Sequence, residues 1–154
     1  MKELQVSAIK EGTVIDHISP DSAFKILKIL NLKGLENEVL FGNNLPSKHG
    51  KKAILKISGK FCTEEEINKI AILSPTATLN IIKDYNVVEK KQVEIPDRLY
   101  GIARCVNPNC ITNNDSVTPK FDIIDKSRIH LRCCYCEKIT RHVNLNVDLG
   151  NLFL

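Results

Sequence analysis

The sequence lacks several features that mark particular classes of protein. It contains no tryptophan, and its aromatic residues are limited to three tyrosines and five phenylalanines, so it shows no platform for stacking nucleic-acid bases. No run of about 18 apolar residues occurs, which excludes an ordinary membrane-spanning helix. The first twelve residues alternate between polar and apolar and do not form the apolar stretch of a secretion signal. We therefore expect a cytoplasmic protein with no membrane partner.

Phosphate-binding motifs are also absent. Neither G-x-x-x-x-G-K-[ST] nor G-x-G-x-x-G occurs in the 154 residues, so a bound nucleotide would not meet the hydrolytic machinery of phosphate-loop enzymes. The net charge of +4 is too small to require a nucleic-acid partner, and we expect none.

The cysteines, in contrast, occur at a recognisable spacing. Four of its six cysteines follow the spacing C-x4-C and C-x2-C, which is typical of structural zinc sites. Cysteines stay reduced in the cytoplasm, so metal binding is favoured over disulfides. The spacing predicts one zinc ion held by Cys105, Cys110, Cys133 and Cys136.

The remaining cysteines have simpler interpretations. Cys134 is predicted to be spare, because the two-residue spacing of its neighbours forms the tighter metal-binding turn. Cys62 is interpreted as a small packed residue. Alternatives stay open: His130 or His142 could replace one cysteine, or all the thiols could simply be buried. Four thiolates would fill the coordination sphere, which favours a structural over a catalytic zinc.

Hydrophobic periodicity predicts an α+β first domain. The pattern indicates strands at 4–9, 38–42, 53–58 and 77–82, a turn at 83–86 and a further extended segment at 87–93. One helix is predicted to begin with Ser19 as its N-cap and Pro20 at the first helical position, and to run to about Gly34. A second is predicted from the capping pair Thr63 and Glu66 to about Ser74. Residues 43–52 are predicted to be a polar loop. This order is the ferredoxin-like βαββαβ arrangement, with both helices on one face of the sheet.

The segment 95–101 contains proline, charged residues and glycine, and is predicted to be a linker. Short β-like runs follow it between polar turns. We therefore expect two domains, residues 1–97 and residues 98–154, the second a small all-β zinc-ribbon-like domain.

Several polar residues interrupt apolar runs in the first domain, and they are Asp16, His17, Lys56, Asn80 and Lys90. Taken singly, each is most simply a solvent-facing strand residue. Taken together, they offer a carboxylate for a ribose hydroxyl and cations for phosphates. The residue pattern leaves both interpretations open.

Four segments of the sequence resemble one known family. These are "LQVSAIKEGTVIDHI", "NLPS", "PTATLNIIKDYNVVEK" and "CVNPNC…CCYCEK", which together resemble the regulatory chain of aspartate carbamoyltransferase from about residue 4 to about residue 147. The resemblance implies a non-catalytic subunit that binds ATP and CTP, with UTP in some members. It implies that the chain modulates separate catalytic chains in pyrimidine biosynthesis. It also implies that the first domain pairs with a second copy, while the zinc domain docks on a catalytic chain.

The resemblance also implies an effector site. By analogy, Lys90 and His17 meet the triphosphate, Asp16 and Lys56 meet the ribose, and backbone near Ile9 and Tyr85 reads the base. Ser7 and Ile81 depart from the family pattern beside this site. The full set of implied effector residues is Ala8, Ile9, Asp16, His17, Lys56, Asn80, Ile82, Tyr85, Val87 and Lys90.

The rival interpretation of the chain as a whole is a zinc-ribbon module that binds nucleic acid.

Overall fold

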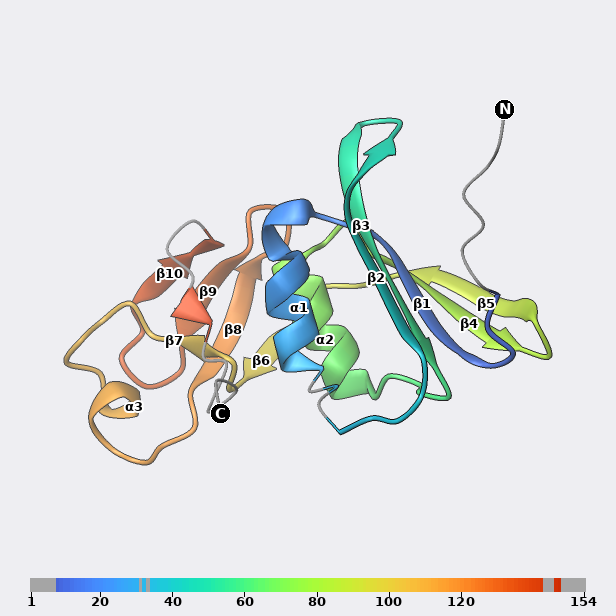
Figure 1. Cartoon of the computed structure of the whole chain (residues 1–154). Helices are drawn as coiled ribbons and strands as arrows, with labels where there is room; N and C mark the ends of the chain where they lie inside the picture. Colours follow the sequence, from blue (N-terminus) through green and yellow to red (C-terminus); the bar gives the residue numbers. More distant parts are fainter. Residues whose placement is uncertain (1–7, 31, 33, 143–145, 148–154) are drawn as a thin grey trace. The chain divides into compact units, whose positions relative to one another are not determined.

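The computed structural model describes residues 8–30, 32, 34–142 and 146–147. The chain divides into two compact units, Met1–Val93 and Glu94–Leu154. Figure 1 shows the helices α1 and α2 against the sheet of the first unit, and a second set of short strands in the other unit.

The first unit is a five-stranded antiparallel sheet with the order β2-β3-β1-β4-β5. Both α-helices lie on the same face of this sheet (Figure 1), so the predicted ferredoxin-like α+β arrangement is confirmed, with β5 added as a hairpin partner of β4. The strands are β1 (Gly12–Ile18), β2 (Val39–Ser47), β3 (Gly50–Ser58), β4 (Thr78–Lys83) and β5 (Asn86–Gln92), and the helices are the 3-10 turn η1 (Pro20–Ser22), α1 (Ala23–Ile29) and α2 (Glu64–Leu73).

Strand alternation creates the core of this unit. Ile15 of β1 lies opposite Leu55 of β3 and Leu79 of β4, and all three side chains are fully buried. Opposed residues share a face, so this row lies on one face of the sheet. Ile26 of α1 and Ile70 of α2 are also fully buried, as expected of helix residues that face the sheet. Residues one position along each strand therefore point to the opposite face, which the helices leave uncovered.

The two helix starts differ in how well the sequence predicted them. The capping box is present at α2: the Thr63 hydroxyl accepts the Glu66 N–H at 3.2 Å, and the Glu66 carboxylate accepts the Thr63 N–H at 2.9 Å. The predicted cap by the Ser19 side chain is wrong, because that hydroxyl makes no capping hydrogen bond. A 3-10 turn starts there instead, closed by a 2.9 Å bond from the Ser22 N–H to the Ser19 carbonyl.

Two strand predictions need correction. Of the strand predicted at 4–9, residues 4–7 lie outside the described part of the chain, and Ala8 and Ile9 have no regular structure. The first strand of the sheet is Gly12–Ile18, a segment that lies outside every strand predicted from the sequence. The alternation of this segment was obscured because Asp16 and His17 lie on it. The loop predicted at 43–52 is also wrong, because β2 and β3 continue through it to a two-residue turn.

The second unit is built from short antiparallel strands in the order β10-β9-β8-β6, with a separate β7-β11 pair. Leu99, Phe121 and Leu131 form its buried centre. The predicted linker is wrong in part, since 98–100 is a strand. The elements are β6 (Arg98–Tyr100), β7 (Ala103–Arg104), the single helical turn α3 (Ile111–Asn114), β8 (Lys120–Asp125), β9 (His130–Cys133), β10 (Ile139–Arg141) and β11 (Asn146–Val147).

Candidate effector site and candidate metal centre

Polar residues form a row across the uncovered face of the first sheet. Val14 of β1 lies opposite Lys56 of β3 on one side and Asn80 of β4 on the other, and Asn80 lies opposite Lys90 of β5. Directly opposed residues share a face. Three of the predicted effector residues, Lys56, Asn80 and Lys90, therefore lie in register on the face away from the helices.

Asp16 extends this polar surface by two residues along β1. Its carboxylate accepts from Lys52 Nζ, at 2.9 Å to Oδ1 and 3.2 Å to Oδ2, and from the backbone N–H of His17 at 2.6 Å. Burial alone would raise the pKa of Asp16, but the hydrogen bonds from Lys52 and His17 outweigh it and lower the pKa below its usual value. Asp16 is therefore an ionised carboxylate that is already partly neutralised by a lysine.

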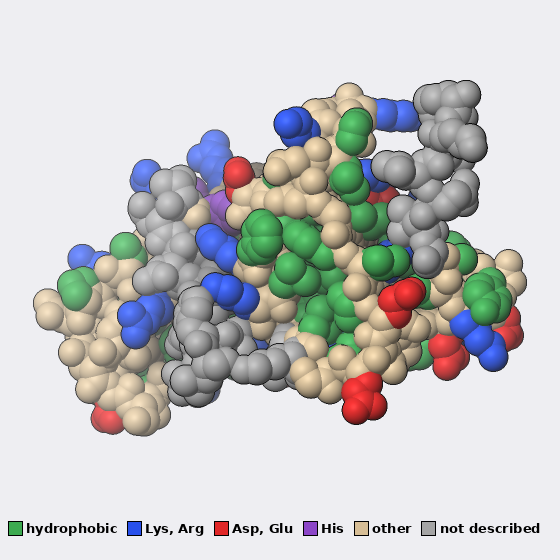
Figure 2. Space-filling model, viewed as in Figure 1, with side chains coloured by type: hydrophobic (Ala, Val, Ile, Leu, Met, Phe, Trp, Pro, Cys, Tyr) green, Lys and Arg blue, Asp and Glu red, His purple; other side chains and the backbone are tan. Residues whose placement is uncertain are grey.

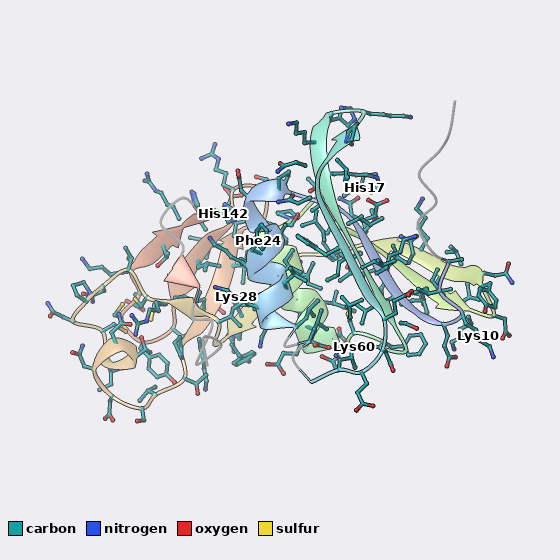
Figure 3. The ribbon with its side chains drawn as sticks, in the orientation of Figure 1. Lys10, His17, Phe24, Lys28, Lys60 and His142 are labelled. Carbon is teal, nitrogen blue, oxygen red and sulfur yellow. The ribbon has the colours of Figure 1, made fainter. Side chains whose placement is uncertain are left out.

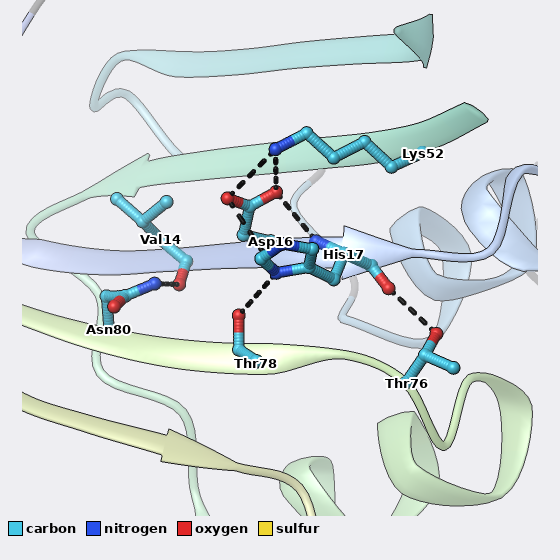
Figure 4. Close-up of polar contacts among 7 residues, drawn as sticks. All are labelled: Val14, Asp16, His17, Lys52, Thr76, Thr78 and Asn80. Carbon is cyan, nitrogen blue, oxygen red and sulfur yellow. Dashed lines mark hydrogen bonds and ion pairs between the residues drawn. The ribbon is translucent and has the colours of Figure 1, made fainter. Parts of the chain in front are cut away.

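His17 is held in an unusual backbone conformation beside that pair. Its φ is +56°, a region that costs a non-glycine residue roughly 1–3 kcal/mol. Figure 4 shows how the surroundings hold it: Thr76 Oγ1 donates to the His17 carbonyl at 2.9 Å, and Thr78 Oγ1 lies 3.1 Å from His17 Nδ1. The ring is exposed, so this backbone conformation places the His17 imidazole in solvent on the uncovered face of the sheet.

A cavity of about 460 Å³ opens next to these groups. Its volume lies within the range of small-molecule sites, about 300–1,000 Å³. The walls are strongly basic, since they include two histidines and two lysines, and the lining residues are His17, Pro46, Ser47, Lys48, His49 and Lys52. Sequence reasoning missed Lys52, although its spacing of four from Lys56 on one strand already places both on the same face.

The other predicted effector residues lie at the opposite end of β1. Ile82 lies opposite Gly12 and is buried, while Tyr85 and Val87 are exposed at 64% and 57%. Tyr85 sits in the β4–β5 turn with φ +65°, and its N–H donates to the Lys10 carbonyl at 2.9 Å. Figure 3 shows Lys10 and His17 at the two ends of this strand. The residues predicted for the effector site thus form an elongated band, here called the effector band, rather than one compact cluster.

The residues next to this band have different positions. Ala8 is exposed and Ile9 is buried just before β1. Ser7 lies outside the described residues. Ile81 pairs with the buried Thr13, so its side chain points to the helix-covered face and not beside Asn80, contrary to our expectation.

In the second unit the structure brings four cysteines together. The sulfurs of Cys105, Cys110, Cys133 and Cys136 all lie within 4.8 Å of one another, with 3.4 Å between Cys105 and Cys136 and 3.7 Å between Cys110 and Cys133. A tetrahedral ion with metal–sulfur bonds of about 2.3 Å places its ligands about 3.8 Å apart. The cluster therefore has the dimensions of a four-thiolate metal site.

Backbone turns on either side hold these sulfurs in place. In the first turn, the Asn113 side chain donates to the carbonyls of Cys105 and Asn107 at 3.0 and 2.8 Å. In the second turn, the N–H groups of Tyr135 and Cys136 point at Cys133 Sγ, at 3.4 and 3.5 Å. Such donors favour sulfur in its negatively charged form.

The thiols differ in how readily they lose their protons. Burial raises the pKa of Cys105 to about 12 and also raises the pKa of Cys133. Burial works the same way at Cys136, but the hydrogen bonds it accepts, first from the Lys138 N–H, lower its pKa to about 7. Four thiolates this close together need a cation to compensate their charge.

The remaining cysteines stay apart from the cluster. Cys134 is exposed beside it, and His130 is not among the grouped residues. Burial, followed by the nearby Glu66 carboxylate, raises the pKa of Cys62 to about 11, as expected of a packed and unreactive thiol.

Comparison with known proteins assigns both units. The family model described as "Aspartate carbamoyltransferase regulatory chain, allosteric domain" matches residues 4–94, and that described as "Aspartate carbamoyltransferase regulatory chain, metal binding domain" matches residues 97–145. Among the described residues, no helix is long and apolar enough to cross a membrane.

Curated relatives agree over nearly the whole length. The aspartate carbamoyltransferase regulatory chain of Pyrococcus furiosus is 57% identical over 97% of this chain and 100% of its own. That of Thermococcus sibiricus is 53% identical over 90% and 92%, and that of Parabacteroides distasonis 49% over 89% and 90%. All carry the name of a regulatory rather than a catalytic chain, as the sequence predicted. The chain belongs to the family of aspartate carbamoyltransferase regulatory chains.

Proposed function

We propose that this regulatory chain binds ATP and CTP, with UTP as a further candidate, on the uncovered sheet face of its first domain, and thereby modulates catalytic chains in pyrimidine biosynthesis. The observation that carries this proposal is the in-register row of Lys56, Asn80 and Lys90, which continues through Asp16 into the basic cavity. Cations suit phosphates, and a carboxylate suits ribose hydroxyls. The apolar Ile82 and the exposed Tyr85 at the other end suit a base.

The ten residues implied by the resemblance fit such an elongated ligand. In this proposal, Ala8, Ile9 and Val87 lie with Ile82 and Tyr85 at the base end, and His17 contacts phosphate. Lys52 joins the site because it holds the Asp16 carboxylate and lines the cavity. A nucleotide changes the activity of the assembly only if it binds two of its states unequally.

We propose that the metal of the four-cysteine cluster is a single structural Zn²⁺. Four sulfur ligands match zinc better than magnesium or calcium, which prefer oxygen. Because four thiolates close the coordination sphere, the ion would stabilise the domain of residues 98–154 and leave no open position for a substrate.

Two protein partners follow from exposed surfaces. Every residue of β5 is exposed, and β5 is an edge strand of the sheet formed by the described residues. An edge strand is suited to association with a second copy of the domain of residues 1–97. The metal domain exposes Val106, Ile111, Tyr135 and Ile139, which suit docking on a catalytic chain. The six free cysteines fit a cytoplasmic location.

Calorimetric titration of CTP into the full chain tests the nucleotide site. We expect Lys90→Ala to weaken CTP binding by about tenfold or more, because a charged hydrogen bond contributes roughly 1.5–3 kcal/mol. Lys91→Ala is the matched control, since it removes the same charge from the adjacent residue, which points to the other face. Equal losses in the two variants, or no CTP binding by the unaltered chain, would contradict the proposal.

A further inference from the structure

The turn between β2 and β3 carries two basic residues that the turn itself does not need. Lys48 and His49 form a two-residue connection between the paired Ser47 and Gly50. The left-handed conformation falls on Gly50, with φ +111°, and not on Lys48 or His49. The backbone therefore places no special demand on the identity of these two side chains, which are both exposed.

The shape of the hairpin brings this turn over the end of the effector band. A bulge between Gly42 and Leu45, with Asn44 at φ +58°, shifts the register of β2 against β3, and such bulges bend a hairpin. Strand β1 ends at Ile18, opposite Ala53. The residues of β3 before Ala53 therefore extend past β1, as the projecting tip of the hairpin in Figure 1 shows.

The turn also completes the basic cavity. Lys48 and His49 line it together with His17 and Lys52, and Figure 2 shows Lys or Arg side chains at the hairpin tip. Neither Lys48 nor His49 has a hydrogen bond or ion pair within the described part of the chain. Asp16, the nearest carboxylate in the band, is already paired with Lys52. Of the four basic side chains that line the cavity, Lys48 and His49 are therefore the two that no other described residue engages.

We infer that Lys48 and His49 bind the terminal phosphate of the effector, so that this site discriminates nucleotides by the number of their phosphates. The inference rests on the proposed function. Lys56 and Lys52 are four residues apart on β3, about 13 Å along the strand, and the turn lies beyond Lys52. A nucleoside monophosphate that binds at the row of Lys56 and Asn80 ends short of the turn of Lys48 and His49. A nucleoside triphosphate bound at the same row extends toward that turn.

The test is calorimetric titration of CTP and of CMP into three forms of the full chain. The double variant Lys48→Gln with His49→Gln removes both groups from an exposed turn. The control Lys51→Gln removes a charge from the same hairpin, at an exposed residue that points to the face opposite Lys52. We expect the double variant to bind CTP about tenfold more weakly, with CMP affinity changed less than about twofold. The Lys51→Gln control should leave both affinities within about twofold of the unaltered chain.

Each outcome decides the matter. An unchanged CTP affinity in the double variant, an equal loss for CTP and CMP, or an equal loss in Lys51→Gln overturns the role of the turn while the proposed function stands. An unaltered chain that binds CMP as tightly as CTP also overturns it. An unaltered chain that binds neither nucleotide refutes the proposed function itself, and the inference with it.

Discussion

Replacing Cys110 by alanine tests the metal centre most severely. The substitution removes one of four sulfurs and leaves Cys133 without its neighbour at 3.7 Å. A core of such a small domain rarely supplies more than about 3–5 kcal/mol of folding free energy, whereas structural zinc contributes about 10–16 kcal/mol in small zinc domains. Because the metal contribution exceeds that of the core, loss of the ion should unfold the metal domain and leave the first domain intact.

The assay compares bound metal and folding in matched variants. After dialysis, elemental analysis should find about one zinc per unaltered chain and below about 0.1 per Cys110→Ala chain, and limited proteolysis should degrade only the metal domain. Cys134→Ala is the control, because that exposed thiol lies outside the cluster and its loss should leave zinc at one equivalent. Full zinc retention by Cys110→Ala, or an intact metal domain after zinc removal, would refute the reasoning.

Two further predictions concern the first domain. Thr63→Ala removes the capping box of α2 and should lower the free energy of unfolding by about 1 kcal/mol in urea titrations, whereas Ser19→Ala, whose hydroxyl makes no cap bond, should change it less than about half as much. Asp16 has a lowered pKa in the folded chain, so its carboxylate contributes stability above the unfolded pKa of about 3.9 that is lost as pH falls through the folded value. The stability difference between the unaltered chain and Asp16→Asn should therefore be constant above about pH 5 and shrink below about pH 4; a pH-independent difference would contradict this assignment.

The sequence predicted best those features that depend on neighbouring residues. The capping box of Thr63 and Glu66 is a local motif, and the structure contains it. The spacing of the cysteine pairs likewise fixes which sulfurs can meet, and the four selected from it do lie together. In both cases a few consecutive residues determine the geometry.

Features that depend on strand pairing were harder to predict. The polar residues at 43–52 predicted a loop although two strands continue through them. An edge hairpin that projects from its sheet has few buried residues, so its sequence does not alternate between apolar and polar residues. Serine is a favoured N-cap residue, but the Ser19 hydroxyl makes no cap bond, and the Ser19 N–H donates instead to Oγ of Ser74, a residue far along the chain, at 2.9 Å. The ion pair of Lys52 with Asp16 likewise needs the registration of β3 against β1.

Activity of catalytic chains reconstituted with this regulatory chain tests the central claim most directly. We predict that CTP shifts the activity of the assembly saturably when the unaltered chain is present. With Lys56→Ala the assembly should still form but lose most of that response, because Lys56 lies in the proposed effector row and outside the metal domain. An assembly whose activity is insensitive to CTP and ATP, or equally sensitive with Lys56→Ala, would contradict the account.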